Sequence, residues 1–147
     1  MDEAPRIFTL EEANELVPTL EVEFGRMARL RAELAPLIEA VGGPEAAAEI
    51  LQERRKSPPG RQVEAQQLKH LATEIAATVE RVNSIGCLVK DLELGLVDFF
   101  AMYEHEPVFF CWQFGEPAVA HWHSIDEGFA SRRPIDGIEI EPPEFMN

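Results

Sequence analysis

Residues 108–133, VFFCWQFGEPAVAHWHSIDEGFASRR, hold the pattern that decides how the second half of this chain folds. They include both tryptophans, one of the two cysteines and two of the four histidines. Aromatic and β-branched residues on either side of Gly115-Glu116 are typical of two strands joined by a tight turn. The segment therefore predicts a β-hairpin, with strands over 108–114 and 117–123, that continues into a polar loop.

Two further strands are expected just before this hairpin. After Gly86 the apolar spacing changes from about 3.6 residues, typical of a helix, to about two, typical of a strand. Residues 87–89 and 96–103 carry the strand pattern, and the polar segments 90–95 and 104–107 carry turn residues. Short connections join antiparallel neighbours, so the sequence predicts a four-stranded antiparallel meander over 87–123.

The N-terminal half carries the helical pattern instead. Thr9 and Glu12 have the spacing of a capping box, and apolar residues then recur at helical spacing as far as Val41. Pro18 and Pro36 each remove a backbone N–H, which predicts a break or kink near 14–17 and near 32–35.

Two more helices follow in the sequence. Gly42-Gly43-Pro44 ends the first helix, and a short helix is expected over 45–56. The apolar stripe of residues 63–85 predicts a second long helix that ends at Gly86. Two long amphipathic helices with a compact connection are expected to pack antiparallel.

These elements define an α+β fold. We expect one domain over 1–147, with a helical part at 9–86, the β-meander at 87–123, and a loop and tail at 124–147. Within the acidic tail, residues 138–140 have the pattern of an edge strand, although disorder is the favoured alternative.

Composition narrows the classes of function. The net charge of −14 opposes binding to nucleic acid and to anionic membrane surfaces. No apolar run approaches the length of about 20 residues that spans a bilayer, and the acidic N-terminus lacks the features of a signal peptide. Cys87 and Cys111 are too few for a disulfide framework, so a cytoplasmic protein with reduced thiols is expected.

His121 and His123 form the strongest chemical pattern. Two residues apart on a strand, they project to the same face, where two imidazoles can hold one Zn, Ni, Mn or Fe ion. The acids nearest in sequence, Glu116 and Asp126, are the preferred further ligands, together with Glu127. The alternative is that both histidines are ordinary polar positions at the end of a strand.

The expected strand register bears on Asp98, which interrupts the apolar run LVDFF. If a two-residue turn joins the last two strands, Phe110 faces His121, and Asp98 faces Cys111 on the opposite side of the sheet. A slip of one residue or a bulge would reverse this assignment. Asp98 is therefore either an acid–base or ion-pairing group or a solvent-facing position at the edge of the sheet.

Three further side chains have alternative roles. Arg132 can hold a carboxylate or phosphate ligand, but pairing with one of the 27 acidic residues is favoured. Cys87 and Cys111 have apolar neighbours and are expected to be small core residues. A Cys111 nucleophile with a histidine base is disfavoured because this register places the thiol on the wrong face.

The strand over 108–114 is apolar on both faces, so both faces need cover. The helices can cover one face, and the tail or a second copy of the chain can cover the other. We therefore favour a non-catalytic binding or interaction protein that forms a homodimer, with its small-molecule ligand unknown. The alternative is a metal-dependent, hydrolase-like enzyme built on His121, His123 and a nearby carboxylate.

The motifs FTLEEANELVP, GCLVKDLELGLVDF, FFCW, GEP and HWHSIDEGFASR occur in this order along the chain. Together they resemble the bacterial domain-of-unknown-function family 2203 over residues 8–134. Ser131 stands where this pattern leads us to expect glycine. The resemblance implies helices followed by a small sheet in a soluble bacterial protein. It implies no activity and no catalytic residues.

Overall fold

The computed structural model describes residues 6–136, which fall into two compact units. The sheet unit comprises residues 6–24 and 81–136, and the helical unit comprises residues 25–80. The tail segment 138–140, for which a strand or disorder was expected, lies outside the described residues.

The first helix is divided as Pro18 predicted. Helix α1 (Leu10–Glu15) begins with the expected capping box: the Thr9 hydroxyl accepts from the Glu12 N–H at 3.0 Å, and the Thr9 N–H donates to the Glu12 carboxylate at 2.8 Å. Helix α2 (Val17–Ala40) follows after a turn at Leu16. The expected break near 32–35 does not occur, because α2 continues through Pro36, and the alternative of a kink there stays a prediction.

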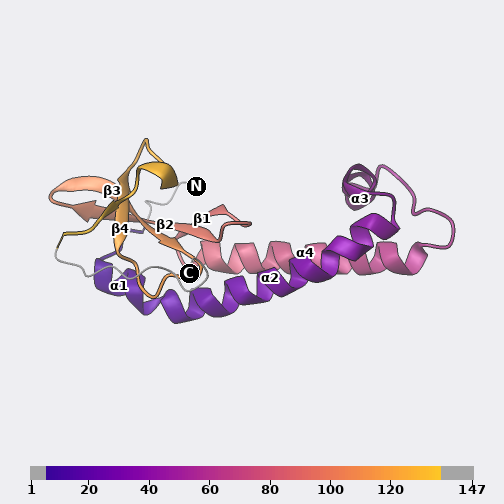
Figure 1. Ribbon diagram of the computed structural model, residues 1–147, viewed down its shortest axis with the longest axis horizontal. Coiled ribbons are helices and arrows are strands. Elements are labelled where there is room, and N and C mark those ends of the chain that lie inside the picture. The colour runs from indigo at the N-terminus through magenta and orange to yellow at the C-terminus, as the bar shows by residue number, and fades with distance from the viewer. Residues whose placement is uncertain (1–5, 137–147) are drawn as a thin grey trace. The chain divides into compact units, whose positions relative to one another are not determined.

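The helical unit contains helix α3 (Pro44–Leu51) and the adjoining parts of α2 and α4 (Gln62–Ser84). Within this unit α2 and α4 run antiparallel, as predicted (Figure 1). Arg26 pairs with Glu74 at 2.9 Å, and Val41, the residue directly after α2, belongs to the same buried cluster as Leu68. Helix α3 is shorter than the predicted 45–56 and buries Ile50 in this cluster.

The sheet unit contains five antiparallel strands in chain order (Figure 1). They are β1 (Leu88–Asp91), β2 (Leu96–Tyr103), β3 (Glu106–Gln113), β4 (His121–Ser124) and β5 (Arg133–Pro134). The α+β class is therefore confirmed. The additional strand β5 has only two residues, which is too short to leave a periodic pattern in the sequence.

The register is as predicted between β2 and β3, where Asp98 faces Cys111. Between β3 and β4 the predicted register is wrong by one residue: Cys111 faces His121, and Phe109 faces His123. The expected two-residue turn is replaced by a loop over 114–120. A one-residue shift moves side chains to the other face, so Asp98 and Cys111 lie on the same face as the histidines.

Asn14 in α1 helps to hold this loop away from a regular hairpin. Its amide oxygen accepts from the Val119 N–H at 2.7 Å, and its amide nitrogen donates to the Val119 carbonyl at 3.3 Å. These two bonds satisfy backbone groups that a regular continuation of β4 would pair with β3.

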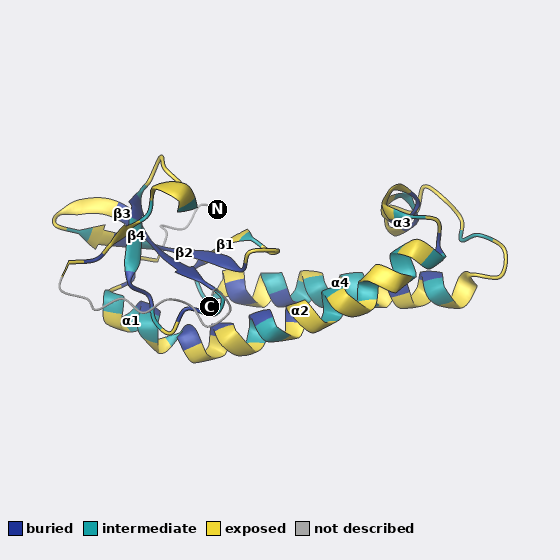
Figure 2. Ribbon diagram, viewed as in Figure 1, coloured by how far each residue is buried: buried dark blue, intermediate teal, exposed yellow. Residues whose placement is uncertain are grey.

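Buried residues lie on both faces of the sheet along its central strands β2 and β3 (Figure 2). On one face the Trp112 ring packs against Phe24 of α2, with centroids 5.9 Å apart. The opposite face carries Asp98 and Cys111, and the loop over 124–132 lies against it through Phe129. The second face of β3 is thus covered around Cys111 by a loop of the same chain.

Candidate metal centre

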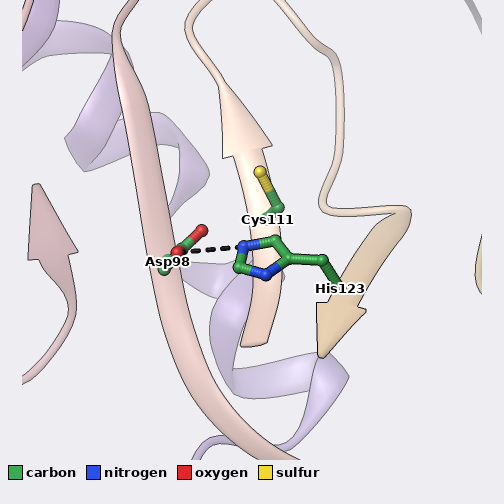
Figure 3. A group of neighbouring side chains, drawn as sticks. All are labelled: Asp98, Cys111 and His123. Carbon is green, nitrogen blue, oxygen red and sulfur yellow. Dashed lines mark hydrogen bonds and ion pairs between the residues drawn. The ribbon is translucent and has the colours of Figure 1, made fainter. Parts of the chain in front are cut away.

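Asp98, Cys111 and His123 come from the three adjacent strands β2, β3 and β4. Their exposed fractions are 3%, 1% and 2%, and one ligand atom from each lies within 4.8 Å of the other two. Figure 3 shows the three side chains gathered on one face of the sheet. The register of the strands produces this cluster, because Asp98 faces Cys111 and β4 places His123 beside them.

The hydrogen bonds of His123 fix which ring nitrogen is protonated. Nδ1 lies 2.9 Å from the Ser124 carbonyl oxygen, which can only accept, so Nδ1 is the donor. Nε2 lies 3.0 Å from Oδ2 of Asp98 (Figure 3). In the neutral ring Nε2 carries a lone pair, and a lone pair facing a carboxylate oxygen requires a proton or a metal cation between them.

The thiol of Cys111 is protonated at neutral pH. Burial, reinforced by the nearby negative charge of Asp98, raises its pKa to about 12, although the Arg132 guanidinium acts in the opposite direction. The thiolate is the nucleophilic form, so this thiol is unsuited to act as an unaided nucleophile. Burial likewise raises the pKa of Cys87 to about 11, which agrees with its expected role as a core residue.

The three ligand types suit a tetrahedral transition metal. Zn²⁺ takes thiolate sulfur at about 2.3 Å and imidazole nitrogen or carboxylate oxygen at about 2.0 Å, which separates its ligand atoms by about 3.3–3.6 Å. The 3.0 Å between Nε2 and Oδ2 is close to these separations, and no two ligand atoms of the group are more than 4.8 Å apart.

One side of the cluster faces a cavity of about 250 Å³. Apolar side chains line much of it, including Phe109 from β3 and Phe129 from the covering loop. Lys90 and Glu127 contribute the charged groups beyond the cluster itself. An ion held by the three side chains would therefore have room for an additional ligand on the cavity side.

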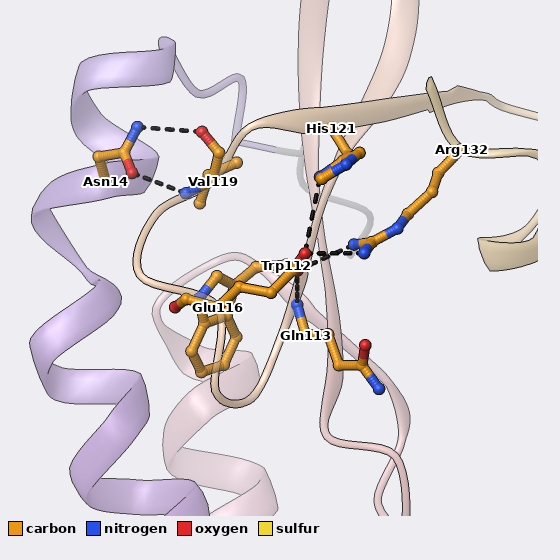
Figure 4. A network of polar contacts seen from close by, with 7 residues as sticks. All are labelled: Asn14, Trp112, Gln113, Glu116, Val119, His121 and Arg132. Carbon is orange, nitrogen blue, oxygen red and sulfur yellow. Dashed lines mark hydrogen bonds and ion pairs between the residues drawn. The ribbon is translucent and has the colours of Figure 1, made fainter. Parts of the chain in front are cut away.

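A second, partly buried cluster joins Glu116, Arg132 and His121 (Figure 4). The guanidinium of Arg132 donates to both carboxylate oxygens of Glu116, at 2.9 and 2.7 Å, and the Gln113 N–H donates to the same carboxylate at 2.6 Å. The internal pairing favoured for Arg132 is thus present, and the carboxylate of Glu116 is held by three donors.

His121 lies beside this ion pair without hydrogen-bonding to it. Its Nδ1 is 3.6 Å from Oε2 of Glu116 and has no hydrogen-bond partner among the described residues. Burial lowers the pKa of His121, and the positive charge of Arg132 adds to this effect. The imidazole is therefore neutral at pH 7.

The candidate site residues group differently in the structure from the metal-ligand set predicted from the sequence. His123 joins Asp98 and Cys111, whereas His121 and Glu116 belong to the second cluster, and Asp126 lies exposed in the loop. The predicted set of His121, His123, Asp126 and Glu116 stays a prediction. The sequence did not predict the cluster of Asp98, Cys111 and His123 because the register predicted between β3 and β4 was wrong by one residue. The acid within LVDFF, Asp98, was nevertheless a signal of a polar site on this strand.

The fold and the buried cluster define a small α+β protein with a candidate transition-metal site. A family described as Uncharacterized conserved protein (DUF2203) matches residues 6–135. The chain belongs to this family, as its motifs indicated. No curated protein and no solved structure matches the chain. Within residues 6–136, no helix combines the length and the apolar character needed to cross a bilayer.

Proposed function

We propose that this protein binds one divalent transition metal ion through Asp98, Cys111 and His123. The observation that carries the proposal is the orientation of His123: its Nδ1 donates to a backbone carbonyl and its Nε2 faces a buried carboxylate. Histidines that bind metals use this arrangement, in which the second ring nitrogen fixes the tautomer and the orientation of the ring. Zn²⁺ suits the mixed sulfur, nitrogen and oxygen donors best.

The electrostatics of the cluster support the same proposal. Within the described part of the chain, Asp98 has His123 as its hydrogen-bonded partner and no arginine or lysine within ion-pair distance. A buried carboxylate is costly without a compensating charge, and a divalent cation supplies that charge. The ion would displace the proton between Asp98 and His123 and the proton of Cys111, so its affinity should rise with pH.

The cavity beside the cluster favours metal-dependent hydrolysis as a second candidate function. Structural zinc sites have four protein ligands, whereas catalytic sites have three and leave a position open for water or substrate. Asp98, Cys111 and His123 supply three, and the cavity of about 250 Å³ borders them. A metal in such a site would supply an activated water, while Phe109 and Phe129 would limit the access of bulk solvent.

Metal analysis of the untagged protein tests the proposal. We expect about one metal equivalent per chain, either as purified or after loading with Zn²⁺ and removal of the excess. Asp98→Asn and Cys111→Ser should reduce the bound metal severely, whereas His121→Ala and Asp126→Ala should retain it. Loss of metal in His121→Ala and Asp126→Ala, with metal retained in Asp98→Asn and Cys111→Ser, would instead support the ligand set built on both histidines.

Cobalt substitution provides a readout that does not depend on the stability of the variants. Co²⁺ bound by a thiolate has an intense sulfur-to-metal charge-transfer absorption, so the wild-type protein should show this band only if Cys111 is a ligand. Near-ultraviolet circular dichroism of each metal-free variant checks that its fold is intact. Metal binding by the wild type without a charge-transfer band would contradict the proposed set.

A further inference from the structure

The negative charge of the chain is concentrated in one of its two units. Residues 25–80 carry eight basic and eight acidic residues, so the helical unit has no net charge. The remaining residues carry five basic and nineteen acidic residues, which accounts for the whole net charge of −14. The helical unit therefore does not repel anionic ligands as the net charge of the whole chain would suggest.

Basic side chains gather around one cavity of the helical unit. The cavity lies at the connection between α3 and α4 and measures about 770 Å³. Arg54, Arg55, Lys56 and Lys69 line it, against a single acid, Glu53. The apolar base of the cavity includes Ile50 and Ala65, which belong to the buried cluster of this unit.

Most of these cations have no carboxylate partner. Arg55 pairs with Glu49 at 2.8 Å, whereas the one side-chain partner of Arg54 among the described residues is the neutral amide of Gln52, at 3.3 Å. Lys56 and Lys69 have no acid within ion-pair distance in the part of the chain that the structure describes. Unpaired bases are unexpected here, because acids outnumber bases 27 to 13 in the sequence.

The backbone after α3 places these groups at the cavity. The Arg54 N–H donates to the Glu49 carbonyl at 2.8 Å and the Glu53 N–H donates to the Ile50 carbonyl at 3.0 Å, which is a Schellman motif. Glu53 takes the left-handed conformation at φ 58°, which is sterically unfavourable for a non-glycine residue. The basic residues that follow this turn line the cavity together with Lys69 of α4.

We propose that this cavity binds a small molecule that carries two or more phosphate groups. Arginine recognises phosphate oxygens through paired N–H groups, and lysine contributes a point charge. Ser57 and Gln66 also line the cavity and can donate further hydrogen bonds. Its volume falls within the usual range for small-ligand sites, about 300–1,000 Å³. A long nucleic acid is a poorer occupant, since the acidic sheet unit repels an extended phosphate backbone.

Calorimetric titration of the full chain with inorganic triphosphate tests this proposal, at low ionic strength and with EDTA present. We expect saturable binding of one triphosphate per chain. The double variant Lys56→Gln/Lys69→Gln should weaken binding by about tenfold or more, because each charged hydrogen bond contributes roughly a tenfold change in affinity. Glu53→Gln should strengthen it by removing the one acid at the cavity.

Arg29→Gln is the matched control. Arg29 is an exposed base of the same unit that does not line the cavity, so its loss should change the affinity by less than about twofold. Equal weakening by the control, the absence of saturable binding, or binding of a single-stranded oligonucleotide but not of triphosphate would each overturn the proposal. Because EDTA is present, binding of triphosphate would not depend on the proposed metal centre.

Discussion

Two buried acids of the sheet unit are compensated in different ways. Glu116 accepts two hydrogen bonds from Arg132 and one from a backbone N–H, so a permanent positive charge neutralises it. Within residues 6–136, the hydrogen-bonded partner of Asp98 is an imidazole, whose charge depends on a proton. This difference separates a structural ion pair from a group that can exchange its proton for a metal ion.

Also at the scale of single residues, His121 should make the free energy of unfolding depend on pH. Its folded-state pKa lies below the ordinary value of 6.5, so the unfolded chain binds the proton more readily. The contribution of His121 is therefore present above about pH 6.5 and is lost progressively as the pH falls below it. Urea unfolding with EDTA at about pH 7.5 and about pH 5.5 measures this loss.

His121→Gln is the comparison, because it removes the titrating group. The variant should lose less unfolding free energy than the wild type over the same pH interval. An equal loss in both proteins would show that other groups cause the pH dependence.

At the scale of elements, the β1–β2 turn and the loop after β3 depend on each other. Gly95 has φ +69°, and its carbonyl accepts from the Phe114 N–H at 2.8 Å. A Cβ atom at residue 95 would lie 2.5 Å from Cβ of Phe114, which is closer than packing allows. Glycine at this position therefore permits the close contact between the turn and the loop.

Gly95→Ala should consequently lower the unfolding free energy by about 2 kcal/mol, since it combines left-handed strain with a steric clash. Gly25→Ala is the matched control: it lies within α2, and a Cβ atom there would meet nothing within 4 Å. The unfolding free energy of this control should rise by about 0.5–1 kcal/mol, because alanine is a better helix former than glycine. Denaturant unfolding of both variants measures the two opposite changes, and a loss of similar size in both would contradict the explanation.

For the whole molecule, the homodimer and the single domain remain predictions. The two apolar faces of β3 were the reason to expect a dimer, and the loop over 125–132 covers part of the second face. A dimer would have to use other apolar surface, such as the groove of about 550 Å³ between α2 and α4 that Leu37 and Leu71 line within the helical unit.

Light scattering at increasing protein concentration tests the dimer. The predicted result is a mass of twice the 16.5 kDa of one chain. Leu71→Glu, which places a charge in the groove, should then restore the mass of one chain. A mass of 16.5 kDa at every concentration would remove the homodimer from consideration.

Patterns within short segments of the sequence were sufficient to predict much of the fold. The capping box at Thr9, the break before Pro18 and the bounds of β2 all follow from neighbouring residues, and the structure confirms them. Of the break or kink expected near 32–35, the break was wrong, since α2 continues through Pro36. The loop over 114–120 was not predictable in the same way, because Asn14 holds it from about 100 residues away in the sequence.

The sequence by itself determined the α+β class, the order of the main elements and the family to which the chain belongs. It also singled out Asp98, as the acid that interrupts LVDFF, and His123, as one of two histidines that could hold a metal ion. Only the tertiary structure decided that these two residues meet beside Cys111. The physical reason is that side chains alternate between faces along a strand, so one residue of register, set by distant contacts, determines which groups share a face.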